Sequence, residues 1–182
     1  MTFARSGVLA ALIAAASAMP ALAHAADGTI TFTGQVTAQT CTINGGAGKD
    51  FTVALPPVSA SSLSIDGATA GRTPFKIVLT ACTSATGNVS AYFEAGTTID
   101  TATGRLKNAA GTATKVQIGL LNSDLTNTAI VLGAAQAAQN SQSVAIASNT
   151  ATLNYFAQYV ASGGAAGVGT VSTSVMYTMS YQ

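Results

Sequence analysis

The sequence has no tryptophan, two cysteines and one histidine, and only 7% of its 182 residues are charged. The histidine, His24, lies in an N-terminal segment that we expect to be removed. Without it, no Ser-His-Asp or Cys-His catalytic arrangement can form, and two thiolates alone leave a zinc ion short of ligands. The six carboxylates fall mostly in turns, and only carboxylates distant in sequence could form an acid–base pair. We therefore predict no enzymatic activity, no cofactor and no metal.

The first 25 residues have the pattern of a secretory signal peptide. Arg5 is the one early cation, an apolar run "GVLAALIAAASAMPALA" follows, and the small residues Ala23 and Ala25 end the segment. A membrane anchor is the alternative, but Ser17 and Pro20 interrupt the run, which is shorter than the roughly 20 residues of a spanning helix. We expect cleavage after Ala25, with Ala23 as the less favoured position, and no membrane insertion.

The processed chain has little charge with which to attract a polyanion. Removal of Arg5 leaves six basic and six acidic residues, hence no net charge. Binding to nucleic acid or to an anionic membrane surface requires a basic excess or a basic patch. We therefore expect neither partner.

The two cysteines, Cys41 and Cys82, are an even count in an exported chain. Oxidising compartments favour disulfides, so we predict that these two residues are bonded to each other. Two free buried thiols are the alternative reading.

What the sequence does contain is a series of short alternating segments separated by glycine- and asparagine-rich turns. The alternation predicts strands in "TITFTGQVTAQTC", "FKIVLTAC", "NVSAYFEAG", "KVQIGLLN", "ATLNYFAQYV" and the final stretch 171–182. Pro56 and Pro57 should end a preceding strand, and "PPVSASSLS" can hold one helical turn. Residues 133–147 are rich in alanine but lack a helical period, so a loop followed by a strand over 143–147 is expected. This pattern favours an all-β sandwich of one domain.

Two of these segments lie at the ends of the processed chain, residues 28–38 and residues 171–181. The first precedes Cys41, so a disulfide there would anchor the fold only downstream of it. A free alternating strand is an aggregation hazard unless another molecule uses it, and insertion into a neighbour's sheet is one known use. From the residues alone, packing of this strand within its own domain remains open beside donation.

Taken together, three stretches resemble the chaperone–usher pilins, and most closely the major subunit of type 1-like fimbriae. They are "GTITFTGQVTAQTC", "LPPVSASSLSIDGATAGRTPFKIVLTAC" and "YVASGGAAGVGTVSTSVMYTMSYQ". The resemblance covers essentially the whole processed chain. It implies an incomplete immunoglobulin-like β-sandwich, completed by a strand that a periplasmic chaperone and then the next subunit donate, with an outer-membrane usher overseeing the exchange.

The resemblance also assigns residues to roles. Residues 1–25 are the signal peptide, 26–40 a donor-strand extension and 41–182 the pilin domain. Cys41 and Cys82 match the disulfide of the family. The donor face consists of Ile30, Phe32, Gly34 and Val36, with the glycine where the acceptor groove is most crowded. The acceptor groove and chaperone-recognition strand contains Val171, Val175, Tyr177, Met179 and Tyr181.

The expected function is that of a structural subunit in the shaft of an adhesive fimbria outside the cell. Its partners would be copies of itself, other fimbrial subunits, the chaperone and the usher. A minor adaptor or tip-associated subunit would share the same two ends. A self-complete, secreted carbohydrate-binding sandwich is the alternative from another class, and the absence of tryptophan argues against its sugar-stacking surface.

Overall fold

The alternating segments form the long strands of the structure. A computed structural model describes residues 40–44 and 49–182. Within these ranges the predicted strands are confirmed as β2 (Thr69–Thr80), β3 (Asn88–Phe93), β6 (Val116–Asn122) and β8 (Ala151–Ala161). Alternation in β2 and β8 places every second side chain in the interior, because successive side chains of a strand point to opposite faces.

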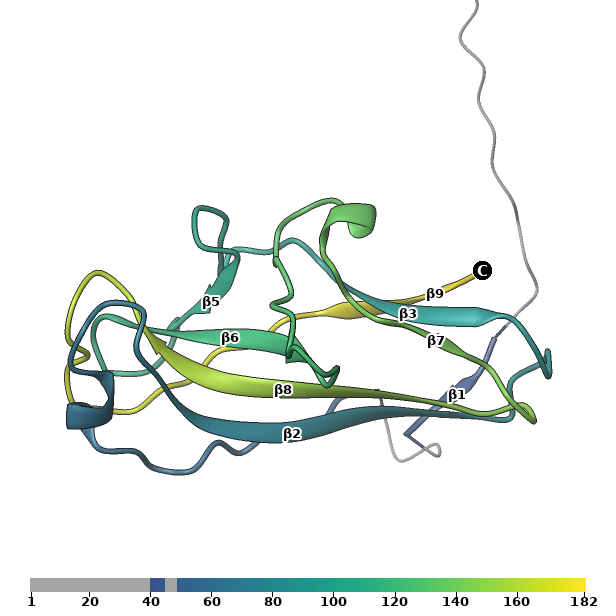
Figure 1. The fold of residues 1–182 in the computed structure, drawn as a ribbon, viewed down its shortest axis with the longest axis horizontal. Coiled ribbons are helices and arrows are strands. Elements are labelled where there is room, and N and C mark those ends of the chain that lie inside the picture. Colours follow the sequence, from purple (N-terminus) through teal and green to yellow (C-terminus); the bar gives the residue numbers. More distant parts are fainter. Residues whose placement is uncertain (1–39, 45–48) are drawn as a thin grey trace, which may run out of the picture. The chain divides into compact units, whose positions relative to one another are not determined.

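The larger sheet has six strands in the order β1-β2-β8-β6-β5-β4, and all neighbours are antiparallel (Figure 1). β1 (Thr42–Ile43), β4 (Ile99–Asp100) and β5 (Arg105–Lys107) are short strands at its margins. At its centre β2 pairs with β8 from Thr69 opposite Val160 to Leu79 opposite Ala151, with one irregularity between Ala70 and Thr73. The pairing of β2 with β8 is the most extensive one in the fold.

The smaller sheet has three strands in the order β7-β3-β9. β7 (Ser143–Ala145) and β9 (Tyr177–Tyr181) lie on either side of β3, and both are antiparallel to it. Figure 1 shows this sheet over the strands β8 and β2 of the larger sheet. Apolar side chains from both sheets form one core, whose buried members include Ile77, Leu79, Val89, Phe93, Leu153 and Tyr155.

Two short 3₁₀ turns complete the described part. η2 (Ala60–Leu63) is the helical turn predicted after the proline pair, and Ser59 caps it by accepting a hydrogen bond from the Ser61 N–H. η3 (Gln136–Ala138) lies in the alanine-rich segment, and β7 follows it. The prediction of a loop and then a strand in this segment is therefore confirmed.

Two predicted strands are absent or shorter than expected. The sequence predicts a last strand over 171–181, but β9 begins only at Tyr177, because Ser172 bonds to the loop residues Asn108, Ala109 and Ala110 instead of to a strand. The residues before Pro56 form no strand, since residues 51–58 have no backbone hydrogen bond within the described part. Both segments are extended nonetheless.

Several predictions lie outside the described residues. These are the signal peptide (1–25), nearly all of the donor extension (26–40), and with it Ile30, Phe32, Gly34 and Val36. Among the residues that are described, none belongs to a helix long and apolar enough to cross a membrane.

Candidate functional site

One edge of the smaller sheet is unpaired. Asn88 and Gln182 exchange two backbone hydrogen bonds, and the Glu94 N–H donates to the carbonyl oxygen of Met176 at 2.8 Å. Because hydrogen-bonded and non-hydrogen-bonded pairs alternate in an antiparallel ladder, every second residue of β9 directs its backbone groups away from β3. No other described strand pairs with that edge. The outward-facing N–H and C=O groups belong to Tyr177, Met179 and Tyr181.

A second extended segment, Phe51–Val58, has an equally unpaired backbone in the described part of the chain. Its side chains alternate: Val53 and Leu55 are half-buried against the core, whereas Thr52 and Ala54 are exposed. Pro56 and Pro57 have no N–H and so cannot join a regular ladder. This segment therefore has the burial pattern of a strand without a partner.

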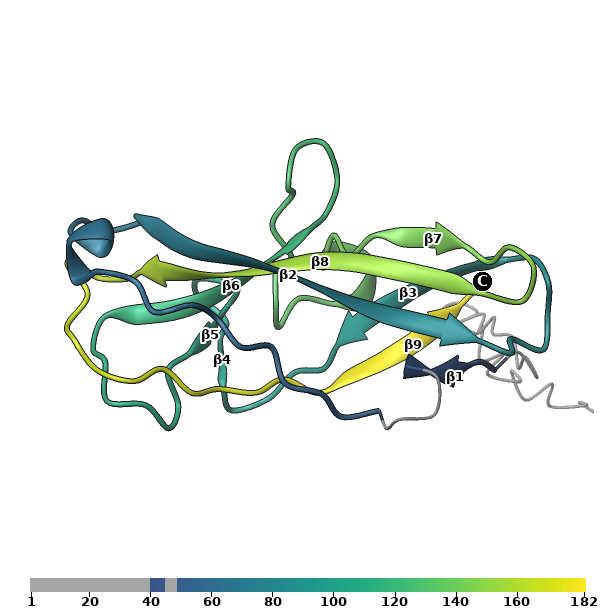
Figure 2. The ribbon, with the colours of Figure 1, turned by 90° about the horizontal axis from the view of Figure 1, so that it is seen from below.

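These two segments are the walls of one groove. At one end, the Tyr177 hydroxyl donates a hydrogen bond to the Lys49 carbonyl oxygen at 2.7 Å, and the Tyr177 ring packs edge-on against Phe51 with centroids 6.2 Å apart. Figure 2 shows the segment before η2 in blue and the stretch that ends in β9 in yellow. We call Phe51–Val58 the first wall, residues 171–181 the second wall, and the space between them the groove.

Aromatic rings pack against one another at this end of the groove, and Tyr155 lies beneath its surface. Phe75 of β2 lies 6.2 Å from Phe51 and stacks on Tyr155 of β8 at 5.4 Å, measured between ring centroids. Tyr155 is fully buried, and its hydroxyl is 3.1 Å from that of Ser141. Burial raises the pKa of Tyr155, and burial together with the nearby Asp50 carboxylate raises the pKa of Tyr177. Both shifts favour the protonated, uncharged form of the phenol.

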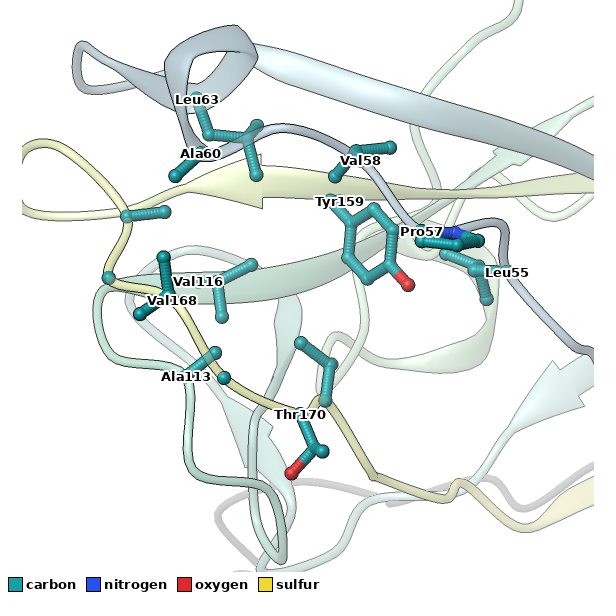
Figure 3. Close-up of a pocket in the computed structure, with 14 residues that line it drawn as sticks. Leu55, Pro57, Val58, Ala60, Leu63, Ala113, Val116, Tyr159, Val168 and Thr170 are labelled. Atoms are coloured by element: carbon teal, nitrogen blue, oxygen red, sulfur yellow. The ribbon is translucent and has the colours of Figure 1, made fainter.

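At the other end the groove widens into an open pocket of about 410 Å³. Figure 3 shows Leu55 and Val58 on one side of it, Val168 and Thr170 on the other, and the Tyr159 ring from β8 between them. Leu63 and Val116, both buried, also line it. The pocket is large enough for an apolar side chain from another segment.

The groove has the properties of a site for an extended polypeptide. Neither wall contains an Asp, Glu, Lys or Arg residue. An inserted strand would hydrogen-bond to the exposed backbone edge, and alternate side chains of that strand would fill the apolar interior. The described residues hold no group of three His, Cys, Asp or Glu side chains that could bind a metal ion.

The residues predicted for the groove lie together on its second wall. Val171, Val175, Tyr177, Met179 and Tyr181 are all half-buried and pack against the same core. Cys41 and Cys82 form a disulfide, with Cα atoms 4.0 Å apart. The sequence reading missed the first wall. A signal for this wall is that Val53 and Leu55 alternate with Thr52 and Ala54 just before the two prolines, which we interpret from the sequence only as the end of a strand.

A β-sandwich with an unpaired edge over an apolar groove defines a strand-accepting subunit. Comparison with known proteins agrees with this class. The family model described as type-1 fimbrial protein, A, matches residues 55–182. The major fimbrial subunit SMF-1 of Stenotrophomonas maltophilia is 51% identical over 169 residues, which are 91% of this chain and 98% of the relative. The F17 fimbrial protein of Escherichia coli is 47% identical over 94% of this chain and 95% of its own length.

Solved structures support the fold. The P pilus rod subunit PapA superimposes with a TM-score of 0.60 at 18% identity and covers 78% of this chain and 99% of its own. A chaperone–usher pilus structure gives a TM-score of 0.57 at 19% identity, over 86% of this chain and 96% of that one. The fold is therefore the incomplete immunoglobulin-like sandwich of pilins. The chain belongs to the type-1 fimbrial protein family and is a structural subunit of an extracellular fimbria.

Proposed function

We propose that this subunit builds the shaft of its fimbria by accepting, in the groove, the extension 26–40 of a neighbouring copy. The unpaired edge of β9 beside the apolar groove is the observation that carries the proposal. The same groove would hold a strand of a periplasmic chaperone before assembly, and an outer-membrane usher would oversee the exchange. The name of the relative at 51% identity, a major fimbrial subunit, supports the shaft role over that of a minor adaptor.

The proposed donor strand is uncharged and has apolar side chains on one face, which suits the apolar groove. Residues 28–38 contain no charged side chain and place Ile30, Phe32, Gly34 and Val36 on one face. Each large apolar side chain that enters the interior stabilises the complex by about 1.5–3 kcal/mol. Backbone hydrogen bonds to the outward-facing groups of β9 add to this, so a donated strand dissociates slowly.

Donation of this kind produces a fibre. The surface that gives the strand differs from the surface that receives it, so the contact between two copies is heterologous. A heterologous contact that does not close on itself generates an open filament. Each copy therefore needs one neighbour to complete its own sandwich and completes the next one in turn, without any catalytic step by the subunit.

The proposal is tested by supplying the strand within the same chain. A second copy of residues 28–38, fused after Gln182 through a short glycine-rich linker, should fill the groove and yield a stable monomer that folds without a chaperone. Size-exclusion chromatography gives the mass of the product, and refolding from denaturant gives its yield. The unfused chain is the reference.

Two matched controls make the test specific. A fused copy with Gly34→Phe should not raise the refolding yield, because the large side chain cannot enter the crowded interior. A fused copy with Gln35→Phe should still raise the refolding yield, because residue 35 lies on the opposite face of the strand from Gly34 and points away from the interior. A refolding yield that no fused copy improves, or that both substituted copies improve alike, would count against donation and in favour of a self-complete sandwich.

A further inference from the structure

The side chain of Asn108 makes four hydrogen bonds that connect two distant parts of the chain. Its Nδ2 donates to the carbonyl oxygens of Ala113 at 2.9 Å and Thr170 at 3.0 Å. Its Oδ1 accepts from the Gly111 N–H at 3.0 Å and the Ser172 N–H at 2.9 Å. These bonds use the full capacity of a side-chain amide, which has two N–H donors and two oxygen lone pairs.

Backbone bonds reinforce this connection. The Ser172 carbonyl oxygen accepts hydrogen bonds from the N–H groups of Ala109 and Ala110, and the Ala113 N–H donates to the Thr170 carbonyl oxygen. The Thr170 N–H also donates to the Thr112 hydroxyl oxygen at 3.0 Å. We call this network between residues 108–113 and residues 170–172 the Asn108 clasp.

The two segments approach each other too closely for side chains at two glycines. A Cβ atom on Gly111 would lie 2.1 Å from the Thr170 carbonyl oxygen. A Cβ atom on Gly169, whose φ is +148°, would lie 2.5 Å from the Ala113 backbone nitrogen. Glycine at these positions permits the close backbone approach on which the clasp depends.

The clasp holds the part of the second wall that lacks a strand partner. Residues 162–176 form no strand, yet Gly169, Thr170 and Val171 line the open pocket at the end of the groove. Ordering a free segment costs conformational entropy, and a binding site that is already ordered does not lose that free energy again on binding.

From these contacts we infer that Asn108 is a positioning residue for strand exchange: it fixes residues 170–172, where the second wall begins, so that the pocket is formed before a donated strand arrives. The inference rests on the proposed function of the groove. Asn108 does not itself line the pocket. It acts through Thr170 and Ser172, and its effect should be confined to the part of the donor that reaches the pocket.

The test measures capture of a synthetic peptide with the sequence of residues 26–40 by the mature subunit, purified in complex with its periplasmic chaperone. Asn108→Ala should slow capture about tenfold, because loss of one or two net hydrogen bonds lowers about tenfold the fraction of subunits in which the pocket is already formed. Thr112→Val, which removes only the hydroxyl from the clasp, is a milder second variant and should slow capture about threefold.

Asn122→Ala is the matched control. Asn122 is buried and also fixes a loop, by donating to the Asn140 carbonyl oxygen at 2.6 Å and accepting from the Gln142 N–H at 2.9 Å. That loop lines neither the pocket nor the walls. Asn122→Ala should therefore capture the peptide at the wild-type rate even though it loses stability.

Peptide length separates a positioning role from a general structural one. Peptides of residues 26–35 and 31–40 each lack one end of the donor. The effect of Asn108→Ala should persist with one of them and vanish with the one that no longer reaches the pocket. Equal capture by the variants and the wild type, or an equal penalty with all three peptides, overturns the role of Asn108 alone. Failure of the wild-type subunit to capture any peptide overturns the proposed function as well.

Discussion

At the scale of single residues, a buried glutamine takes the place of a strand. Gln139 is fully buried, and its side-chain amide accepts a hydrogen bond from the Phe93 N–H at 3.0 Å and donates one to the Phe93 carbonyl oxygen at 2.6 Å. Phe93 stands opposite Tyr177 in a pair whose backbone groups face away from β9. β7 pairs with β3 only as far as Ser90, so the amide satisfies groups that β7 does not reach.

We predict that Gln139→Leu lowers the free energy of unfolding of the mature subunit by about 2–5 kcal/mol, because two buried backbone groups lose their partners. Denaturant unfolding followed by circular dichroism measures the change. Gln136→Leu, an exposed substitution in the adjacent turn η3, serves as the control and should change stability by less than about 0.5 kcal/mol. A loss of the same size in both variants would contradict the assigned role.

At the scale of elements, the two-residue strand β1 is held by bonds in addition to its own ladder. β1 has two residues, which pair with Thr80 and Leu79 of β2. The disulfide from Cys41 to Cys82 closes the same junction, and the Thr83 N–H donates to the Thr40 carbonyl oxygen at 2.9 Å. If residues 26–40 donate a strand as proposed, a force exerted by the neighbouring subunit would reach the fold through this junction.

Replacement of both cysteines by alanine should therefore weaken the domain itself. The disulfide joins residues 41 positions apart. For a loop of this length, the constraint on the unfolded chain corresponds to about 4 kcal/mol. The midpoint of urea unfolding should fall accordingly for the double variant, and the reduced wild type should behave in the same way. Unchanged midpoints in both samples would show that β1 is held without the covalent bond.

At the scale of the whole molecule, the proposed assembly would rely on apolar contacts and backbone hydrogen bonds rather than on charge. The donor segment 28–38, the first wall and the second wall contain no Asp, Glu, Lys or Arg residue. Residues 26–182 carry six basic and six acidic residues and so have no net charge. Long-range attraction therefore contributes little to the encounter between two subunits.

The rate of donor-peptide capture should consequently depend weakly on ionic strength. Between about 50 mM and about 500 mM sodium chloride, we expect a change of less than about twofold, because salt screens only charged groups. Stopped-flow measurement with a labelled peptide of residues 26–40 gives this rate. A capture rate that falls by a factor of about ten or more would place charged side chains outside the groove in the encounter.

The alternation of residues along the sequence was sufficient to predict the strands, because a strand is formed by residues that are neighbours in the chain. Alternation with a period of two indicated β2, β3, β6 and β8, because a half-buried strand needs apolar residues on one face only. The same reasoning identified the apolar face of the second wall, Val171 to Tyr181, although only Tyr177–Tyr181 forms a strand. The even cysteine count of an exported chain was sufficient to pair Cys41 with Cys82.

What the sequence by itself determined is thus an all-β, disulfide-bonded chain with few charged residues and an apolar stripe at its C-terminal end. Only the tertiary structure decided which segments face each other: the strand order of the two sheets, the first wall at Phe51–Val58, and the bonds of Asn108 and Gln139. The physical reason is sequence separation. Asn108 and Thr170 are 62 positions apart and Gln139 and Phe93 are 46 apart, and no local pattern encodes a contact between residues that only the packing of the sheets brings together.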